Sequence, residues 1–244
     1  MIRKIFQILA LFAVTALVGW ILKKAIFRYR SSGSETIETR LRQLSAAVKK
    51  RLGPDFQKAG VPYPPARLVL AGFKQEGILE VYAAGAGESQ GSLRFIRAYP
   101  IRRASGTLGP KLKEGDRQVP EGLYAIEYLN PNSAYHLSMK ISYPNAFDRA
   151  RGAEEGRTNL GGDIMIHGKD VSIGCLAMGD EAAEDLFVLA ALTGISKVGV
   201  ILSPVDFRRT QPPQDPNLPA WTATLYPQIR EVVASLPGRT ASGQ

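Results

Sequence analysis

The sequence predicts a mainly β domain with short helices, preceded by one N-terminal transmembrane helix. Two patterns carry this prediction. Between residues 67 and 203, short stretches that alternate apolar and polar residues are separated by turns rich in glycine and proline. Residues 5–22 form an apolar run without a charge, as in a membrane-spanning helix. With 244 residues, the chain is long enough to bury one sizeable core besides such a helix.

The apolar run reads IFQILALFAVTALVGWIL and includes Gln7 but no charged residue. Its 18 residues, at about 1.5 Å per residue, approach the minimum for crossing a bilayer. A cleavable signal peptide is the alternative, but its apolar region is shorter, about 7–15 residues, and ends in a small-x-small site. This run ends in GWIL, followed by Lys23 and Lys24. We therefore expect residues 1–30 to be an uncleaved membrane anchor with basic flanks.

The net charge of +9 is concentrated near the start of the chain. Six basic residues and no acidic ones lie within residues 1–30, which leaves only +3 for residues 31–244. A nucleic-acid-binding surface needs its Lys and Arg in the folded domain. The basic residues are therefore interpreted as flanks of a membrane segment, and no nucleic-acid partner is predicted. Because both flanks of the apolar run are basic, charge counting does not assign the side of the membrane.

Residues 31–66 are expected to form an amphipathic helix and a proline-rich joint. Four apolar residues recur at helical spacing, namely Ile37, Leu41, Leu44 and Val48. Gly53 and Pro54 are typical of a helix end, so the helix is expected to stop there. The sequence VPYPPA that follows predicts extended backbone.

Residues 67–203 are expected to form the main domain. The stretches RLVLAGF and ILEVYAAG predict a hairpin that turns at residues 74–77. Five further strands are indicated by RFIRAYPI, GLYAIEYL, HLSMKIS, IMIHG and VGVILS. Between the last two, EAAEDLFVLAALTG predicts a helix with acidic residues in its first turn and Gly194 at its end.

Residues 204–244 are expected to be a proline-rich tail with a short helix. The segment WTATLYPQIREVVASL has an amphipathic pattern and predicts a helix that is broken by, or starts near, Pro227. Packing of this helix on the surface of the domain is the default expectation.

The stretch HGKDVSIGC contains His167 and Cys175, the only cysteine of the chain. A cysteine near a strand-to-helix turn meets backbone N–H groups that stabilise a thiolate or an oxyanion. Gly168 and Gly174 allow close approach of backbone or substrate, and a neutral imidazole at His167 accepts a thiol proton. The alternative is a buried structural thiol, since free cysteine is among the most buried residue types. A zinc site is not indicated, because the chain lacks paired cysteines.

Other polar residues of the domain have plainer interpretations. Tyr143-Pro144-Asn145 is a turn signal. Asp116 and Glu121 flank a loop that contains proline and are expected at turns and on the surface. His136 falls in an alternating stretch and is expected to be structural or to face solvent.

Four segments in a fixed order resemble the L,D-transpeptidase (YkuD-type) catalytic domain family, and in particular its YafK-like murein branch. They are KLKEGDRQVPEGLY, SMKISYPNAFDRARG, GGDIMIHG and SIGCLAMGDEAAEDLF. The resemblance covers residues 67–203, and the four segments together are specific where the SxGC element by itself is weak. The family has a β-rich, sandwich-like fold, and no metal or cofactor is implied.

The resemblance implies cysteine-dependent acyl transfer on peptidoglycan. Cys175 attacks a carbonyl of the peptide stem at diaminopimelate and forms a thioester acyl-enzyme, with His167 as general base and then acid. Gly168 orients the imidazole through its carbonyl group. Backbone N–H groups around Gly174 and Cys175 form the oxyanion hole. The acyl group passes to an amine or to water.

The segment around the cysteine departs from the family pattern at two places. Ile173 stands where many members have a second histidine, and Leu176-Ala177-Met178 stands where many have an arginine. Carboxylate recognition is then expected from Arg149 or Arg151. The resemblance implies a substrate-binding set of five residues, Ser172, Ile173, Tyr143, Asn145 and Arg149.

The expected function is therefore an L,D-transpeptidase acting on peptidoglycan stem peptides. The alternatives are an amidase that hydrolyses diaminopimelate-linked bonds, for example to release a peptidoglycan-bound lipoprotein, and a non-catalytic peptidoglycan-binding domain. If His167 lowers the pKa of Cys175, a thiol reagent labels the enzyme near neutral pH, whereas a buried thiol stays unlabelled. Because peptidoglycan lies outside the inner membrane, we expect an inner-membrane anchor and a periplasmic domain, or a domain secreted to the periplasm after cleavage.

Overall fold

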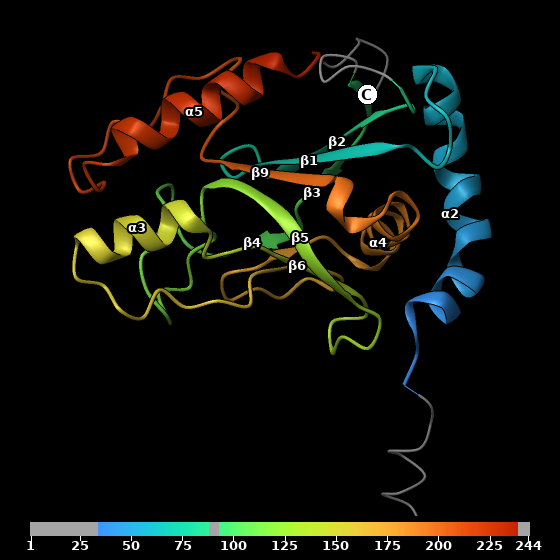
Figure 1. The fold of residues 1–244 in the computed structure, drawn as a ribbon, viewed down its shortest axis with the longest axis horizontal. Coiled ribbons are helices and arrows are strands. Elements are labelled where there is room, and N and C mark those ends of the chain that lie inside the picture. Colours follow the sequence, from blue (N-terminus) through green and yellow to red (C-terminus); the bar gives the residue numbers. More distant parts are fainter. Residues whose placement is uncertain (1–33, 88–92, 239–244) are drawn as a thin grey trace, which may run out of the picture. The chain divides into compact units, whose positions relative to one another are not determined.

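The computed structural model describes residues 34–87 and 93–238 (Figure 1). Contacts divide the chain into two units, Met1–Thr36 and Ile37–Gln244, and the fold below is that of the second unit. The expected anchor, residues 1–30, lies outside the described residues. Within the described ranges, no helix is both long and apolar enough to cross a bilayer.

Nine strands in the described part of the chain form one sheet in the order β3-β2-β1-β9-β5-β6-β7-β8-β4. The longer strands are β1 (Arg67–Phe73), β2 (Ile78–Ala84), β3 (Arg94–Pro100), β5 (Gly122–Asn130) and β9 (Val198–Ser203). The shorter ones are β4 (Arg103–Ala104), β6 (Ser138–Ile141), β7 (Met165–His167) and β8 (Leu176–Ala177). The predicted strands are confirmed, including the hairpin of β1 and β2. The sequence did not predict β4 and β8, because two residues are too few to show an alternation.

The sheet is continuous, which corrects the expectation of a sandwich-like domain. Strand β5 pairs with β9 through Gly122–Ala125 and with β6 through Ile126–Asn130. The β5–β6 register shifts between Ile126 and Tyr128, and irregularities of this kind bend a strand. One long strand thus joins two halves of a bent sheet.

Helices cover both faces of the sheet, and β1 shows how its residues divide between them. Leu68 and Leu70 belong to a core shared with α2 (Ile37–Ala59) and α4 (Asp180–Thr193). Ala71 and Phe73 belong to a second core shared with α5 (Thr222–Ser235). Figure 1 shows α5 on the side of β1 and β9 opposite to α4. A strand buried on both faces has few polar residues, as in β1.

Helix α2 runs through Pro54, where the sequence predicted its end. Val48, Leu52 and Phe56 are buried at a spacing of four residues, before and after the proline. Proline removes one backbone hydrogen bond, but the apolar face on either side of Pro54 packs on the core and keeps the helix continuous. Helix α5 is a similar case, because it begins at Thr222 and contains Pro227.

Helix α3 (Ala146–Glu154) was not predicted, since the preceding residues were interpreted as a turn. Asn145 is its N-cap: the side chain accepts the Asp148 N–H at 3.0 Å, and the Asp148 carboxylate accepts the Asn145 N–H at 2.9 Å. This reciprocal capping box satisfies two N–H groups that the helix leaves free.

Glu121 is buried, with 1% of its surface exposed, which corrects its expected place on the surface. Its carboxylate accepts the Lys74 ammonium at 2.9 Å, the Gly109 N–H at 2.8 Å and the Tyr226 hydroxyl at 2.9 Å. A buried charge requires such partners. The network ties the loop before β5 to the β1–β2 hairpin and to α5. Asp116, by contrast, is a turn residue as predicted.

Candidate active site

His167 and Cys175 come from neighbouring strands at the short-strand end of the sheet. Strands β7 and β8 are parallel, with Ile166 opposite Leu176 and His167 opposite Ala177. Ile166 and Leu176 are each 1% exposed and face the core. Because side chains alternate along a strand, His167 and the residue directly before β8, Cys175, point to the other face. Adjacent strands lie about 4.8 Å apart, so the fold brings the two predicted catalytic residues together.

Both residues line a cleft of about 620 Å³. The remaining walls come from three loops, the one before β5, the one before β6 and the one before β7. The lining includes Lys111, Glu114, Arg117, Ser133, Tyr135, Asp163, Met165 and Ile173. Cys175 is partly exposed at this cleft, whereas His167 is only 2% exposed. The thiol is therefore accessible from the cleft, which is the first requirement for a nucleophile.

The imidazole of His167 is held in one orientation. Its Nδ1 lies 2.6 Å from the Gly168 carbonyl oxygen, so Nδ1–H donates and Nε2 keeps its lone pair. Burial lowers the pKa of His167, opposed by the Gly168 carbonyl. The ring of Tyr135 lies against the imidazole, with 4.7 Å between centroids. His167 is thus a neutral base in the free protein.

Only glycine fits beside His167. A Cβ on Gly168 would lie 2.6 Å from the Asp180 carboxylate and 2.8 Å from the Tyr135 carbonyl oxygen. Neither contact is possible without a shift of the neighbours. The tight packing holds in place the carbonyl that orients the imidazole, in the role implied by the resemblance.

The Cys175 thiol has two backbone neighbours. It accepts the Met165 N–H at 3.4 Å and lies 3.7 Å from the Asp163 carbonyl oxygen, to which it donates. Burial raises the pKa of Cys175, and the Met165 N–H opposes this. The shifts of both pKa values favour a neutral thiol and a neutral imidazole in the free protein.

The hydroxyl of Ser172 organises the loop that carries Cys175. Its oxygen accepts the N–H groups of Gly174 and Cys175 at 3.3 and 3.1 Å and donates to the Cys175 carbonyl at 2.6 Å. Gly174 has φ +124°, a conformation that favours glycine. The two N–H groups expected to form an oxyanion hole are thus directed at Ser172. The N–H hydrogen-bonded to the sulfur is that of Met165.

Of the other four predicted substrate-binding residues, one lines the cleft and three do not. Ile173 is 75% exposed and lines the cleft. Tyr143 is 2% exposed and donates its hydroxyl to the Leu160 carbonyl at 3.0 Å. Asn145 caps α3, and Arg149 donates to the carbonyl of Pro144. Tyr143, Asn145 and Arg149 are not among the residues that line the cleft, because their polar groups serve the backbone around α3.

The structure adds residues that the sequence analysis missed. Lys111, Arg117, Tyr135 and Met165 all line the cleft. Arg117 stands inside a segment already noted for its resemblance, so a signal was present, but no spacing rule places that loop opposite Cys175. Tyr135 lies in a loop whose position depends on the pairing of β5 with β6.

His136 stays outside this cleft. Its Nε2 lies 3.0 Å from the Glu184 carboxylate on α4, which is consistent with the structural role expected for it. Among the described residues, His, Cys, Asp and Glu side chains do not gather in a group of three that could hold a metal ion.

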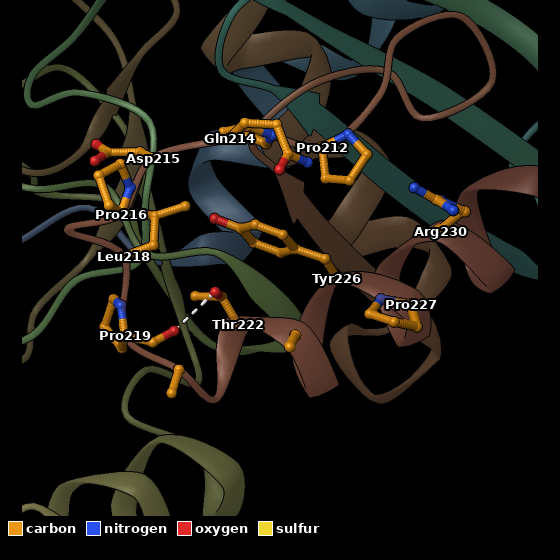
Figure 2. Close-up of a pocket in the computed structure, with 13 residues that line it drawn as sticks. Pro212, Gln214, Asp215, Pro216, Leu218, Pro219, Thr222, Tyr226, Pro227 and Arg230 are labelled. Atoms are coloured by element: carbon orange, nitrogen blue, oxygen red, sulfur yellow. Dashed lines mark hydrogen bonds between the residues drawn. The ribbon is translucent and has the colours of Figure 1, made fainter.

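A second cavity of about 640 Å³ lies between the proline-rich segment 212–220 and α5 (Figure 2). Tyr226 and Arg230 from the helix face Pro212, Asp215 and their neighbours. Its lining contains neither cysteine nor histidine, so Cys175 and His167 mark the first cleft as the candidate active site.

A comparison with protein families agrees with this assignment. The model of the L,D-transpeptidase catalytic domain, YkuD, matches residues 76–200, which contain both His167 and Cys175. The chain belongs to the YkuD family. It thus carries an L,D-transpeptidase-type catalytic domain.

Individual proteins are also similar to this chain. YafK of Escherichia coli (strain K12), named provisionally as an L,D-transpeptidase, is 39% identical over 142 residues, which are 57% of this chain and 53% of YafK. The chain thus spans about half the length of the curated relatives it matches.

Two solved structures are also similar. The helical cell shape determining protein Pgp2 from Campylobacter jejuni is 24% identical over 61% of this chain and 50% of its own, with a TM-score of 0.46. Bd1075 of Bdellovibrio bacteriovorus is 18% identical over 71% and 56%, with a TM-score of 0.40.

Proposed function

We propose that this protein is a cysteine-dependent acyltransferase that acts on diaminopimelate-containing peptide stems of peptidoglycan. The observation that carries the proposal is the placement of Cys175 and His167 on one face of the β7–β8 pair, both open to one cleft. Membership of the YkuD family and the name given to YafK support the same reaction.

The first half-reaction forms a thioester. Nε2 of His167 takes the proton of the Cys175 thiol as the sulfur attacks the stem carbonyl, because Nδ1 is committed to Gly168. The tetrahedral intermediate collapses when the imidazolium protonates the leaving amine. The carbonyl carbon exchanges its bond to nitrogen for a bond to sulfur.

The second half-reaction releases the product. An acceptor amine loses a proton to His167 and attacks the thioester, which forms a new amide and returns the proton to the sulfur. Water in place of the amine gives a free carboxylate and makes the protein a hydrolase. The same cleft serves both outcomes, so the acceptor decides the reaction.

Mass spectrometry of reaction products tests the proposal. The purified full chain is incubated with diaminopimelate-containing muropeptides, with and without an acceptor amine, beside a Cys175→Ala variant. Crosslinked or exchanged stems that are absent with the variant are the expected result. Cleavage with incorporation of water would assign the amidase alternative. A folded protein with no Cys175-dependent product would overturn the enzyme proposal in favour of a binding domain.

We also propose that residues 5–22 anchor the protein in the inner membrane with the catalytic domain in the periplasm. The support is the uncharged apolar run in the sequence and the location of the proposed substrate. Membrane fractionation, and protease digestion of spheroplasts, are expected to show a membrane-bound domain that is accessible from outside. A soluble full-length protein would contradict the anchor.

A further inference from the structure

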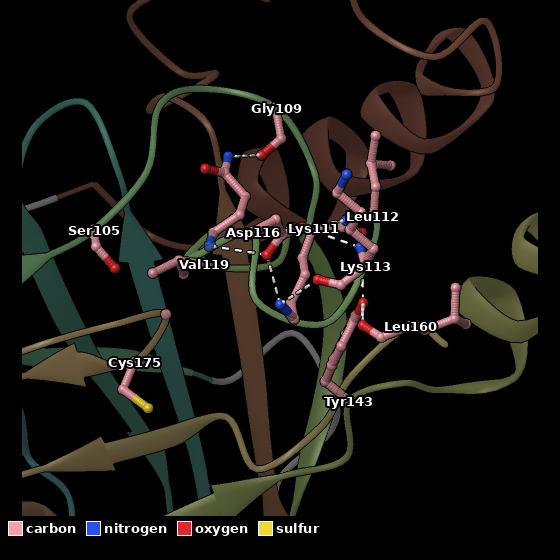
Figure 3. A network of polar contacts seen from close by, with 12 residues as sticks. Ser105, Gly109, Lys111, Leu112, Lys113, Asp116, Val119, Tyr143, Leu160 and Cys175 are labelled. Atoms are coloured by element: carbon pink, nitrogen blue, oxygen red, sulfur yellow. Dashed lines mark hydrogen bonds and ion pairs between the residues drawn. The ribbon is translucent and has the colours of Figure 1, made fainter. Parts of the chain in front are cut away.

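The loop 111–118 faces the nucleophile across the cleft and carries two charges that the proposed chemistry does not use. A Cβ built on Gly174 would lie 3.6 Å from the Gln118 carbonyl oxygen and 3.9 Å from the Arg117 carbonyl carbon. The loop therefore touches the backbone directly before Cys175. Figure 3 shows its polar network beside Cys175. Lys111, Glu114 and Arg117 of this loop all line the cleft.

The loop is held in a set conformation by Asp116. Its carboxylate accepts the N–H groups of Leu112, Lys113 and Gln118 at 2.8, 3.0 and 3.1 Å, and the Lys111 ammonium at 2.6 Å (Figure 3). Burial by itself would raise the pKa of Asp116, but Lys111 and these N–H groups hold the pKa below its ordinary value. A carboxylate that stays charged keeps the loop in place over the working pH range.

Arg117 follows directly and has φ +54°. A non-glycine residue in the left-handed region costs about 1 kcal/mol or more and persists only where its surroundings impose it. Here the Asp116 turn imposes it. The side chain of Arg117 is exposed at the cleft and has no hydrogen bond or ion pair within the described residues. The loop thus presents a free guanidinium to the cleft that Cys175 also lines.

The other cations near the site are already committed. Lys111 is bound to Asp116 and to the Lys113 carbonyl, at 2.6 and 2.8 Å. Arg149 donates to the carbonyl of Pro144, and Arg151 pairs with Glu154 at 2.6 Å. The three residues after Cys175 are buried and apolar. Of the basic side chains that line the cleft in the described chain, Arg117 is the one available to bind an anion.

Glu114 supplies the opposite charge. Its carboxylate lies over Gly161, where a Cβ would come 2.2 Å from Oε2, and it has no ion pair within the described ranges. Asp163, the other acid of the cleft, pairs with Lys140 at 3.2 Å. A simple anion bound to Arg117 would meet repulsion from Glu114, whereas a group with an amine beside a carboxylate satisfies both charges.

We propose that Arg117 and Glu114 form a subsite for a free α-amino acid centre of the acyl donor, with Arg117 on the carboxylate and Glu114 on the ammonium group. The inference depends on the proposed function, because diaminopimelate has two such centres. When the carbonyl of one is attacked by Cys175, the other retains its charges. The subsite selects stems whose second centre is free.

Paired substrates test the role of Arg117. A stem peptide with a free carboxylate at the second centre is compared with its carboxamide. Arg117→Ala is expected to raise KM for the free carboxylate about 10- to 100-fold, the value of one charge-assisted bidentate contact, and to change KM for the carboxamide less than about threefold. Lys113→Ala removes the same charge from the same loop outside the cleft and is expected to match the wild type. Arg117→Gln provides a second variant of similar size.

Glu114 has a corresponding test. Glu114→Gln is expected to raise KM about tenfold for a stem with a free amine at the second centre, and to leave KM for the N-acetylated stem unchanged. An equal loss on both members of either substrate pair would overturn the subsite. Carboxylate-dependent loss with Arg149→Ala in place of Arg117→Ala would overturn it as well.

Binding separates failure of the subsite from failure of the proposed reaction. Calorimetry with the Cys175→Ala protein, alone and combined with Arg117→Ala, measures the affinity for the stem peptide without turnover. Absence of any Cys175-dependent product in the wild type contradicts the reaction, while an Arg117-dependent preference for the free carboxylate still supports the subsite. Equal affinity for carboxylate and carboxamide in an active enzyme contradicts the subsite alone.

Discussion

The two halves of the sheet are built differently. In the long-strand half, β3, β2, β1 and β9 have six or seven residues each, and β1, β2 and β9 are almost entirely buried. In the short-strand half, β6, β7, β8 and β4 have two to four residues. The candidate nucleophile and base lie in the short-strand half.

The difference shows how stability and chemistry are divided in this fold. The long-strand half is stabilised by apolar burial on both faces of the sheet. In the short-strand half, local hydrogen bonds set the geometry, as Ser172 does for Cys175 and Gly168 does for His167. Short strands leave many residues in loops, and loops held by such bonds can expose polar groups to a substrate. Substitutions in the long-strand half should therefore mainly lower the free energy of unfolding, and substitutions in the short-strand half should mainly lower kcat.

The largest expected effect is on catalysis, from His167→Ala in the short-strand half. Removing the general base should lower kcat about 10³-fold, or about 4 kcal/mol of transition-state stabilisation. The Tm should fall only moderately, since the imidazole is hydrogen-bonded to its own neighbour Gly168 and its main packing partner is the ring of Tyr135. Turnover of muropeptides by the purified variant measures kcat, and a thermal melt measures the Tm. A kcat near that of the wild type would mean that another group is the base.

The connection between the halves is tested by Glu121→Ala. It leaves the Lys74 ammonium, 8% exposed, without its carboxylate, which should cost about 3–5 kcal/mol of unfolding free energy. Glu127 pairs with Lys140 at 3.3 Å on the surface, so Glu127→Ala is the control and should cost less than about 1 kcal/mol. Urea denaturation of both variants measures the difference, and equal values would refute the role of burial.

In the long-strand half, Leu70→Ala should lower the free energy of unfolding by about 2–5 kcal/mol, because the side chain is fully buried. The kcat of the folded fraction should stay within about twofold of the wild type. Leu192→Ala, at a position 36% exposed, is the matched control and should cost less than about 1 kcal/mol. A large change in kcat with Leu70→Ala would show that the two halves are not independent.

Ser172→Ala should moderately lower both the free energy of unfolding and kcat. It removes a hydroxyl that makes three hydrogen bonds around Cys175, which should cost about 1–2 kcal/mol of stability and lower kcat about tenfold. The Ser105 hydroxyl only approaches Ser172 at 3.5 Å, so Ser105→Ala should have neither effect. Thermal melts and turnover assays check both variants.

The smallest expected effect is on the pH dependence of thiol labelling. Burial raises the pKa of Cys175, so the native thiolate fraction at pH 8 should be lower than in denaturant, and alkylation should be slower. Labelling should accelerate as the pH rises past the ordinary thiol value. A neutral His167 contributes no charge, so His167→Ala should change the rate less than about twofold. A native labelling midpoint near neutral pH that disappears in this variant would indicate a thiolate–imidazolium pair.

Sequence patterns predicted much of the fold because they are local. Alternation identified the strands from Arg67 onward, and the apolar period with Gly194 identified α4. The patterns failed where packing overrides a local signal. Pro54 lies inside α2 because residues before and after it pack on the same core, and Glu121 is buried because Lys74, distant in the sequence, neutralises it.

The candidate nucleophile and base followed from the sequence by itself, since the chain has one cysteine and a histidine eight residues before it, in a segment resembling a known family. The residues that form the walls of the cleft did not follow from the sequence. Arg117, Glu114 and Tyr135 belong to loops whose positions depend on strand pairing over long separations. The protonation state of Cys175 and His167 was also decided by the tertiary structure, because burial by residues remote in the sequence shifts both pKa values toward the neutral forms.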